Sequence, residues 1–550
     1  MRGSFFVCAL SALIAVGCGD NEAPCGDGTT RDESGRCVGN LSCGPGTVEQ
    51  DGQCVAEVPL EPGSFQAPLV QLQRLQGTES HMHVAQVKYR ASDSKLFYCS
   101  YTFGVIDAAD PQSMRYRVQG LRHQTPSGSP RVPGCLHLAW DEDNPNLVYT
   151  SHRGNIDFAR FLSGWDVTSA TAPVQMPALQ EPNTRYGGLD VENGLIYVAL
   201  QEGGLGIYDY DPVGRAFTRL GTATGLSNAW SVIVNGHTAY VADGAGGLAT
   251  VDVTNPAAPV FLGRVVFGGN AEEVAVDGNV AYVAAGSAGL VIVNVANPAA
   301  PAILSRVEIP GSAVNVAYSA GRAYVAGWND VRAFDVSTPS APSFIGATRL
   351  TTEQSYRVCS GTPEVCVPDD LRPDPTARTL AVAAHNDTLF IGNWWVPYSF
   401  QVHADRKAPY LVLPEDVALV DFGPAAPGEA RSHDVVVRND GNAPLTLFNN
   451  FTSAGIFQVS PPQVRIQPGE SATVKLGYTA SRAQMERGLV TFMSDDPSQP
   501  IRKAYVLGNQ PGLGVGKPLP DTVATLVDGS TFSTAPLTGS VKLLAYFATF

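Results

Sequence analysis

One tetrapeptide, Ala-Tyr-Val-Ala, recurs at a fixed spacing in the middle of the chain and limits which folds are possible. It occupies residues 239–242, 281–284 and 323–326, so that each copy follows the previous one by 42 residues. An apolar run and a Gly-containing turn precede each copy, and a Gly-rich or polar turn and a further apolar run follow it. This regularity is typical of a repeat protein, and its frequent Gly and Pro residues leave no room for helices.

The repeating unit predicts a β-propeller. A period of about 40–45 residues with four short strands is typical of one propeller blade, whose small sheet buries both faces only when neighbours stack on it. Apolar runs such as Leu290–Val293 fit strands that are covered on both faces. The aromatic position of the repeat extends in both directions, to Tyr98, Tyr149, Tyr197, Tyr240, Tyr282, Tyr324 and Phe390. These positions predict seven blades, with longer loops where the spacing widens to 48, 51 and 66 residues.

The third strand of the unit resembles that of the LVIVD-repeat propellers. Residues Leu290–Asn294 read Leu-Val-Ile-Val-Asn, with Asn in place of the terminal Asp. Looser copies are Leu248–Asp252, Val331–Asp335 and Leu205–Asp209. The resemblance implies a propeller fold for this part of the chain.

The first 17 residues predict an export signal. One Arg precedes an apolar run from Phe5 to Val16, which is too short to span a bilayer stably. Residues 15–18, Ala-Val-Gly-Cys, resemble the lipobox of bacterial lipoproteins, although that family prefers Leu where Ala15 stands. The resemblance implies that Cys18 carries lipid and begins the mature chain, the alternative being an ordinary signal-peptidase site. We expect an exported protein, lipid-anchored at the bacterial cell envelope or surface, that meets the membrane through its lipid only.

The cysteine count agrees with this interpretation. The chain has ten cysteines, and eight remain to pair if Cys8 leaves with the signal and Cys18 carries lipid. We expect these eight to form disulfides in an oxidising location: Cys25, Cys37, Cys43, Cys54, Cys99, Cys135, Cys359 and Cys366.

Residues 18–62 predict a compact Cys-rich stalk made of two related units. Spacing favours Cys25 with Cys37 and Cys43 with Cys54, although four cysteines allow three connectivities. A structural zinc site would need closely spaced Cys pairs, which this segment lacks. The four remaining cysteines lie in the first two blades and before the last blade.

Few residues of the predicted propeller suggest chemistry. His81 and His83 are two apart and would share one strand face, and His137 and His152 belong to the next unit, so a His cluster that binds a metal at the channel mouth is possible, centred on His81, His83 and His137. The positions just before the first apolar run of several units hold His137, Gly188, Ser231, Glu273 and Asn315. This mixture of residue types fits the lining of a water-filled central channel better than the coordination sphere of a metal ion. We therefore expect no metal, no cofactor and no catalytic residue.

Two further pairs have ordinary structural explanations. Glu272 and Glu273 are adjacent, and neighbours on a strand point to opposite faces, which separates their carboxyl groups. Trp394 and Trp395 are a possible stacking surface for a sugar, but packing within the last blade is the simpler role. The Gly-rich segment 243–248 recurs 42 residues later, which predicts hairpin turns and not a phosphate loop.

Residues 413–510 predict a second domain. Strand-like runs alternate with turns at the spacing of a β-sandwich, as in His433–Leu445 and Ile466–Val474. The whole stretch resembles the Ig-like modules of the abnormal-spindle and hydin type. The resemblance implies a spacer or interaction platform without a catalytic site.

Residues 511–550 resemble the start of a thioredoxin-like redoxin domain. Val515–Asp521 and the apolar run Val541–Phe547 carry the resemblance, although Thr522 stands where the family usually has Phe. In that family this run leads directly into the redox Cys, whereas the sequence here ends at Phe550. The resemblance implies an incomplete N-terminal part of such a domain, without its catalytic thiol.

Together these features predict an all-β protein: a seven-bladed β-propeller and an Ig-like β-sandwich, with a small disulfide-rich N-terminal stalk. The predicted segments are a signal (1–17), the stalk (18–62), the propeller (63–412), the sandwich (413–510) and the redoxin-like part (511–550). A net charge of −15 with scattered Lys and Arg argues against nucleic-acid binding.

The expected function is a non-catalytic binding or scaffolding surface whose propeller face takes an unknown protein or glycan. The alternative is an extracytoplasmic thiol-disulfide oxidoreductase or thiol peroxidase, which would require the chain to continue into a complete redoxin domain.

Overall fold

The computed structural model describes fifteen segments of the chain, in which every regular element is a β-strand. These segments are 29–31, 37–39, 47–50, 53–56, 60–75, 84–99, 102–124, 134–153, 160–328, 330–350, 379–393, 396–414, 419–509, 523–525 and 531–533. The predicted all-β class is confirmed. Across these segments no helix is long and apolar enough to cross a membrane.

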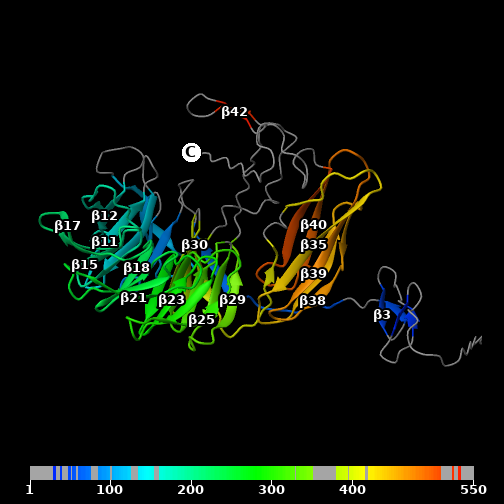
Figure 1. The fold of residues 1–550 in the computed structure, drawn as a ribbon, viewed down its shortest axis with the longest axis horizontal. Helices are drawn as coiled ribbons and strands as arrows, with labels where there is room; N and C mark the ends of the chain where they lie inside the picture. The colour runs from blue at the N-terminus through cyan, green and yellow to red at the C-terminus, as the bar shows by residue number, and fades with distance from the viewer. Residues whose placement is uncertain are drawn as a thin grey trace, which may run out of the picture. The chain divides into compact units, whose positions relative to one another are not determined.

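Seven four-stranded antiparallel sheets form the blades of a propeller, as the repeat predicts (Figure 1). Blade 1 is β6 (Gln86–Arg90), β7 (Lys95–Cys99), β8 (Thr102–Asp107) and β9 (Arg115–Arg122). Blade 2 is β10 (Gly134–Asp141), β11 (Asn144–Arg153), β12 (Phe161–Asp166) and β13 (Val174–Gln175), and blade 3 is β14 (Leu189–Glu192), β15 (Leu195–Ala199), β16 (Leu205–Asp211) and β17 (Ala216–Ala223). Blade 4 is β18 (Ser231–Asn235), β19 (Thr238–Ala242), β20 (Leu248–Asp252) and β21 (Val260–Val265). Blade 5 is β22 (Glu273–Asp277), β23 (Val280–Ala284), β24 (Leu290–Asn294) and β25 (Ala302–Val307), and blade 6 is β26 (Asn315–Ser319), β27 (Arg322–Ala326), β28 (Val331–Asp335) and β29 (Ser343–Thr348).

Blade 7 combines the two ends of the propeller. Its strands β30 (Thr379–His385), β31 (Thr388–Asn393) and β32 (Pro397–Val402) come from the end of this domain, while the outer strand β5 (Leu69–Arg74) comes from its beginning. The pairing of β5 with β32 aligns Leu69 with Val402 and Arg74 with Tyr398. The first strands of neighbouring blades contact one another in the order β6, β10, β14, β18, β22, β26, β30 and back to β6, so the ring is closed.

The aromatic position that revealed the repeat lies in the second strand of every blade. All seven residues are buried: Tyr98, Tyr149, Tyr197, Tyr240, Tyr282, Tyr324 and Phe390. Apolar side chains of adjacent blades pack together, as Ala242 and Tyr240 of blade 4 do with Val283 and Val291 of blade 5. Each blade therefore covers its neighbour with apolar surface, which stabilises the ring through the hydrophobic effect.

The last residue of the LVIVD-like strand ends that strand by a hydrogen bond. The Asp252 side chain accepts from Thr254 N (2.8 Å), and the Asp335 side chain accepts from Ser337 N (2.9 Å). Asn294, the departure from the family pattern, accepts from Ala296 N at 2.9 Å in the same way. Asn and Asp both form this local turn, which explains why either fits the position.

The second domain is a sandwich of two sheets (Figure 1). One sheet has the order β33 (Leu411–Val412), β35 (Ala430–Asn439), β39 (Ser471–Thr479), β37 (Phe457–Ser460). The other has the order β34 (Leu419–Asp421), β41 (Ile501–Gly508), β40 (Glu486–Ser494), β36 (Leu445–Thr452), β38 (Val464–Ile466). Val435, Leu476 and Phe492 are among the buried residues between the sheets. The first strand of the sandwich along the chain is β33.

A buried ionic cluster joins the propeller to the sandwich. Arg332 of β28 lies 2.9 Å from Asp330 and 2.6 Å from Asp440, which follows β35. Tyr410 donates a hydrogen bond from its hydroxyl to Asp330 (3.1 Å), and the Arg332 guanidinium lies 5.3 Å from the centre of the Tyr410 ring. Despite burial, the two carboxylates and Tyr410 raise the pKa of Arg332, so it remains a cation.

The chain divides into two units, and the described residues of the first, Met1–Pro59, form two hairpins. β1 (Thr29–Arg31) pairs with β2 (Cys37–Gly39), and β3 (Thr47–Gln50) pairs with β4 (Gln53–Ala56). Near the C-terminus, β42 (Val523–Thr525) pairs with β43 (Thr531–Ser533).

Several predictions concern residues that the structure does not describe. The proposed lipid site Cys18, most of the redoxin-like stretch and the pair Cys359 and Cys366 lie outside the described residues. The side chains of the four stalk cysteines also fall outside them, so the predicted stalk disulfides stay predictions.

Candidate functional site

A polar network fills the centre of the propeller, where the first strands of the blades converge. The Glu273 carboxylate at the start of β22 is its hub: Oε2 lies 2.9 Å from His137 Nε2 and 3.3 Å from Asn315 Nδ2, while Oε1 accepts a hydrogen bond from the Ser231 hydroxyl. Gln86 Nε2 lies 2.7 Å from His137 Nε2. We call these five residues the channel network.

The channel network brings together four of the five aligned positions that the sequence singled out. Each stands at or near the beginning of the first strand of its blade, so the repeat itself aims the side chains at the axis. The fifth position, Gly188, provides space: a Cβ there would lie 2.8 Å from Ser231 Cα and 2.7 Å from Ser231 Oγ. A side chain at Gly188 would therefore displace Ser231 from the network.

Sequence reasoning missed Gln86, although a signal was present. Gln86 is followed by Val87, just as Ser231, Glu273 and Asn315 are each followed by Val. Tyr98 alone places blade 1 in the repeat, and aligning Gln86–Val87 with the other polar-Val pairs would add Gln86 to the set.

The network keeps Glu273 ionised although its side chain is buried. Burial alone raises the pKa of a carboxyl group, but the attraction and hydrogen bond of His137, together with the Ser231 hydroxyl, hold the pKa of Glu273 below its ordinary value. The amide N–H of Leu189 lies 3.4 Å from His137 Nδ1, and His137 Nε2 is within hydrogen-bond distance of both the Glu273 carboxylate (2.9 Å) and the Gln86 side-chain amide (2.7 Å). The five side chains of the channel network thus form a hydrogen-bonded cluster across the central axis of the propeller.

A cavity of about 480 Å³ lies over the turns of blades 4 and 5. Its lining is small or polar: Ala245, Gly268, Gly269, Asn270, Glu272, Gly286, Ser287 and Ser312. These residues belong to the turns between second and third strands and to the connections between blades. Paired backbone hydrogen bonds fix the same turns, between Gly244 and Ala271 and between Gly286 and Ala313.

Glu272 is the one carboxylate in the lining of this cavity. Burial raises the pKa of Glu272 to about 7, and no hydrogen bond or ion pair of its side chain is present among the described residues. Its neighbour Glu273 is held in the channel network instead. The two carboxyl groups therefore have separate surroundings, although Glu272 lies just before β22 and only Glu273 belongs to the strand.

The other sequence-based candidates are not brought into a site by the described part of the chain. His81, His83, Trp394 and Trp395 lie outside the described residues. His137, which the sequence placed with His81 and His83 in a possible metal group, instead forms hydrogen bonds within the channel network. The structure also joins Cys99 of blade 1 to Cys135 of blade 2 in a disulfide.

The fold and site define a class: a seven-bladed β-propeller with a polar axial plug and an open cavity over its turns, joined to an Ig-like β-sandwich. Two family matches name the parts. The LVIVD repeat matches residues 227–266, 268–308 and 310–349, which are blades 4 to 6, and the HYDIN/CFA65/VesB-like Ig-like domain matches residues 412–508. The chain thus contains LVIVD repeats and a HYDIN-type Ig-like domain.

Solved structures add a likeness at the level of fold. The WD40 β-propeller domain of Doa1 has 12% identity and a TM-score of 0.43, covering 60% of this chain and 97% of that chain. The structure of U3-55K has 10% identity and a TM-score of 0.45, covering 62% of this chain and 100% of that chain. No curated protein matches the chain.

Proposed function

We propose that this protein is an exported, lipid-anchored component of the bacterial cell envelope whose propeller presents a non-catalytic binding or scaffolding surface. The observation that carries the proposal is the cavity over blades 4 and 5. It is large enough for part of a polar ligand, and loops carried by a rigid scaffold are the usual place for recognition.

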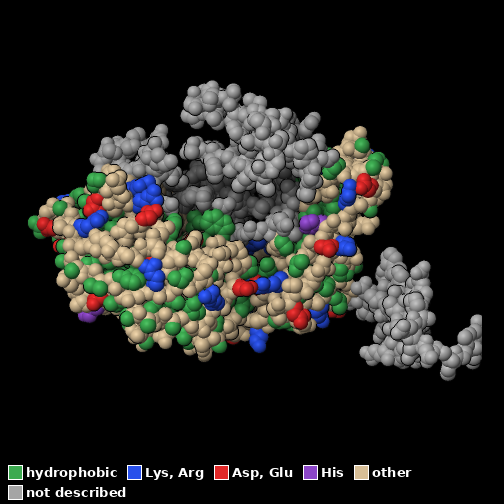
Figure 2. All heavy atoms as spheres, in the orientation of Figure 1, with side chains coloured by type: hydrophobic (Ala, Val, Ile, Leu, Met, Phe, Trp, Pro, Cys, Tyr) green, Lys and Arg blue, Asp and Glu red, His purple; other side chains and the backbone are tan. Residues whose placement is uncertain are grey.

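The chemistry of the cavity favours a segment of a protein or a glycan. Gly268, Gly269 and Gly286 leave the backbone accessible, while Asn270, Ser287 and Ser312 supply hydrogen-bonding side chains. Glu272 disfavours an anionic ligand when it is ionised. On the face shown in Figure 2, basic and acidic side chains are interspersed, which is unlike the basic stripe of a nucleic-acid-binding surface.

Two observations support the envelope location. The Cys99–Cys135 disulfide is of the kind that persists outside the cytoplasm. The apolar run of the first 17 residues and the lipobox-like residues 15–18 support export and lipid attachment at Cys18.

Metabolic labelling with an alkyne fatty acid tests the anchor. We expect label in the wild-type protein and none in Cys18→Ser, which should leave the membrane fraction. Equal labelling of the two proteins would refute lipid attachment at Cys18.

Photocrosslinking in intact cells tests the binding surface. A photoreactive amino acid in place of Ser287, in the cavity, should yield a discrete adduct that disappears when Ser312→Trp fills the cavity. The control site is Val213, which is 93% exposed in the turn between β16 and β17. Digestion of the adduct with a protease or a glycosidase separates a protein partner from a glycan. Adducts that are equal at the two sites, or unchanged by Ser312→Trp, would refute the proposal.

The rival function, thiol-disulfide exchange, is tested with the same purified chain. We expect no reduction of insulin disulfides by a dithiol above the uncatalysed rate, because residues 511–550 contain no Cys to act as the redox thiol. A rate well above that background would support the oxidoreductase instead.

A further inference from the structure

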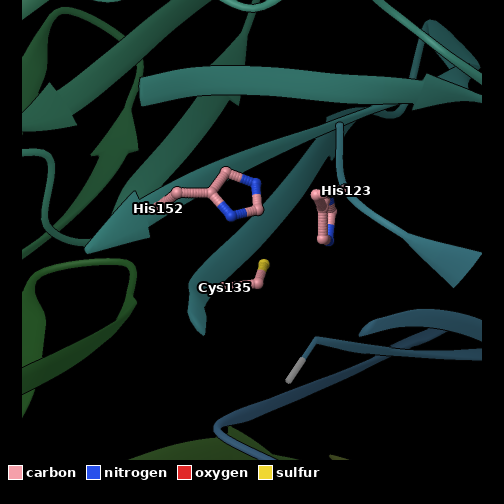
Figure 3. A group of neighbouring side chains, drawn as sticks. All are labelled: His123, Cys135 and His152. Atoms are coloured by element: carbon pink, nitrogen blue, oxygen red, sulfur yellow. The ribbon is translucent and has the colours of Figure 1, made fainter. Parts of the chain in front are cut away.

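A second group of chemically active side chains lies between blades 1 and 2 (Figure 3). His123 follows β9, Cys135 belongs to β10 and His152 belongs to β11. One potential ligand atom from each residue lies within 4.8 Å of the others, and all three residues are buried. Figure 3 shows the Cys135 sulfur directed toward the space between the two imidazole rings.

His123 is the residue that ordinary packing does not explain. Its side chain is 3% exposed, and neither ring nitrogen has a hydrogen-bond partner among the described residues. A buried polar group without a partner costs free energy, whereas a neutral imidazole nitrogen is a good metal ligand.

His152 is held in position beside it. The centroids of the two imidazole rings are 4.1 Å apart, and the His152 ring stacks on Phe161 at the same centroid distance, 4.1 Å. Thr150 Oγ1 lies 3.1 Å from His152 Nε2 and orients the ring. Such a neighbouring hydrogen-bonding group is typical of metal-ligating histidines.

We propose that reduction of the Cys99–Cys135 disulfide opens a buried site for one Cu(I) ion, with the Cys135 thiolate and one ring nitrogen each of His123 and His152 as ligands. A dithiol reductant converts the disulfide to two thiols and is itself oxidised to a disulfide. The Cys135 thiol then releases one proton as its sulfur binds the ion. In the oxidised protein the same sulfur is bonded to Cys99, and the site is closed.

The surroundings select this ion by charge and by ligand number. One thiolate and one Cu(I) ion are neutral together, which suits a site whose neighbours include the apolar residues Phe103, Leu138 and Trp165. Soft thiolate ligands favour Cu(I), whereas a structural Zn²⁺ ion requires four ligands. Cys99 is not part of the group of atoms that lie within 4.8 Å of one another.

A matched pair of variants tests the proposal without any reductant. Cys99→Ser leaves Cys135 as a free thiol, Cys135→Ser leaves Cys99 as a free thiol, and both lack the same disulfide. Purified full-length proteins are titrated anaerobically with Cu(I) against the competing chelator bicinchoninate. We expect about one tightly bound Cu(I) ion in Cys99→Ser that is absent from Cys135→Ser, and none in the oxidised wild type.

The histidines are tested in the Cys99→Ser background. His123→Ala or His152→Ala should weaken Cu(I) binding by at least about tenfold, which corresponds to about 1.4 kcal/mol. Far-UV circular dichroism spectra like that of the parent variant check that each protein is folded, because the His123 ring lies 5.3 Å from the Trp165 ring and its loss alone would alter tryptophan fluorescence. X-ray absorption of dithiol-reduced, copper-loaded wild type needs no substitution and should show nitrogen and sulfur ligands together.

Each of four results would overturn the proposal. The first is equal Cu(I) binding by Cys99→Ser and Cys135→Ser. The second is full affinity in folded His123→Ala, and the third is a wild-type copper shell made of sulfur alone. Displacement of Cu(I) by an equal concentration of Zn²⁺ would overturn the assignment of the ion.

Discussion

Replacing the adjacent carboxylates Glu272 and Glu273 by Gln should change the stability of the propeller in opposite directions. Glu273 accepts hydrogen bonds from His137, Ser231 and Asn315, and Gln retains only one acceptor oxygen. Loss of one hydrogen bond to a charged group costs about 2 kcal/mol. Glu273→Gln should therefore lower the free energy of unfolding by about 2 kcal/mol at pH 8.

Glu272→Gln should have the opposite effect. A pKa of about 7, against an ordinary value of 4.5, corresponds to at most about 3.4 kcal/mol between the two protonation states. Because Glu272 is partly exposed to solvent, we reduce this to about 1–2 kcal/mol. Gln cannot ionise, so Glu272→Gln should raise the free energy of unfolding by that amount at pH 8.

The pH dependence separates the two effects. The pKa of Glu273 is lowered in the folded protein, so its stabilising contribution is present above about pH 4.5 and is lost as the pH falls through the folded-state value. The pKa of Glu272 is raised in the folded protein, so ionisation of Glu272 destabilises the fold. This destabilisation is absent below about pH 4.5 and increases until the pH passes about 7. At pH 4 we expect Glu272→Gln and the wild type to be equally stable.

Urea unfolding followed by tryptophan fluorescence measures both effects in the propeller alone. All six tryptophans of the chain lie within residues 63–412 and none lies in the sandwich. Equal shifts of the urea midpoint for Glu272→Gln and Glu273→Gln at pH 8, or a Glu273→Gln protein more stable than the wild type, would refute the electrostatic account.

Three other perturbations test the architecture. Arg332→Met leaves the buried Asp330 without its cation, while Asp440 keeps its ion pair with Arg438, and should cost about 3 kcal/mol. It should also speed proteolytic separation of propeller and sandwich, and an unchanged cleavage rate would contradict the interface. Deletion of residues 60–75 removes the outer strand of blade 7 and should abolish the cooperative fluorescence transition, whereas a retained transition would mean that the ring does not need this strand. Gly188→Ala places a Cβ 2.8 Å from Ser231 Cα and should lower the free energy of unfolding by about 1–3 kcal/mol. Its control is Gly194→Asn, in a positive-φ turn with open space around it, which should lower the free energy of unfolding by less than about 0.5 kcal/mol. Equal losses in the two variants would refute the steric argument.

The repeat made most of the fold predictable from the sequence. Because Tyr240, Tyr282 and Tyr324 recur at a spacing of 42 residues and take the same place in successive blades, one aligned residue located the strands around it. The origin of β5 was not predictable in this way. β5 is not joined to a neighbouring strand by a hairpin turn, so the local sequence does not show its partner. Its place in blade 7 follows only from its pairing with β32 in the structure.

The candidate sites were predictable to different degrees. His137, Ser231, Glu273 and Asn315 are in phase with the repeat, so their convergence on the axis followed from alignment. The group of His123, Cys135 and His152 was not foreseen, because its members come from three strands or strand ends with no common spacing. Only the packing of blade 1 against blade 2 brings them together.

The pairing of β5 with β32 also determines how the molecule responds to mechanical tension. Leu69 and Val402 are partners in this pairing, so the chain enters and leaves the propeller at neighbouring points. Before entering, it is hydrogen-bonded to the sandwich, through Leu60 N to Gln463 and Gly63 N to Asp495, both at 2.8 Å. A force applied to the chain before Leu60 would therefore act first on the hydrogen bonds between this segment and the sandwich. Blades 1 to 6 lie between the two paired strands β5 and β32, so the force would not pass through them.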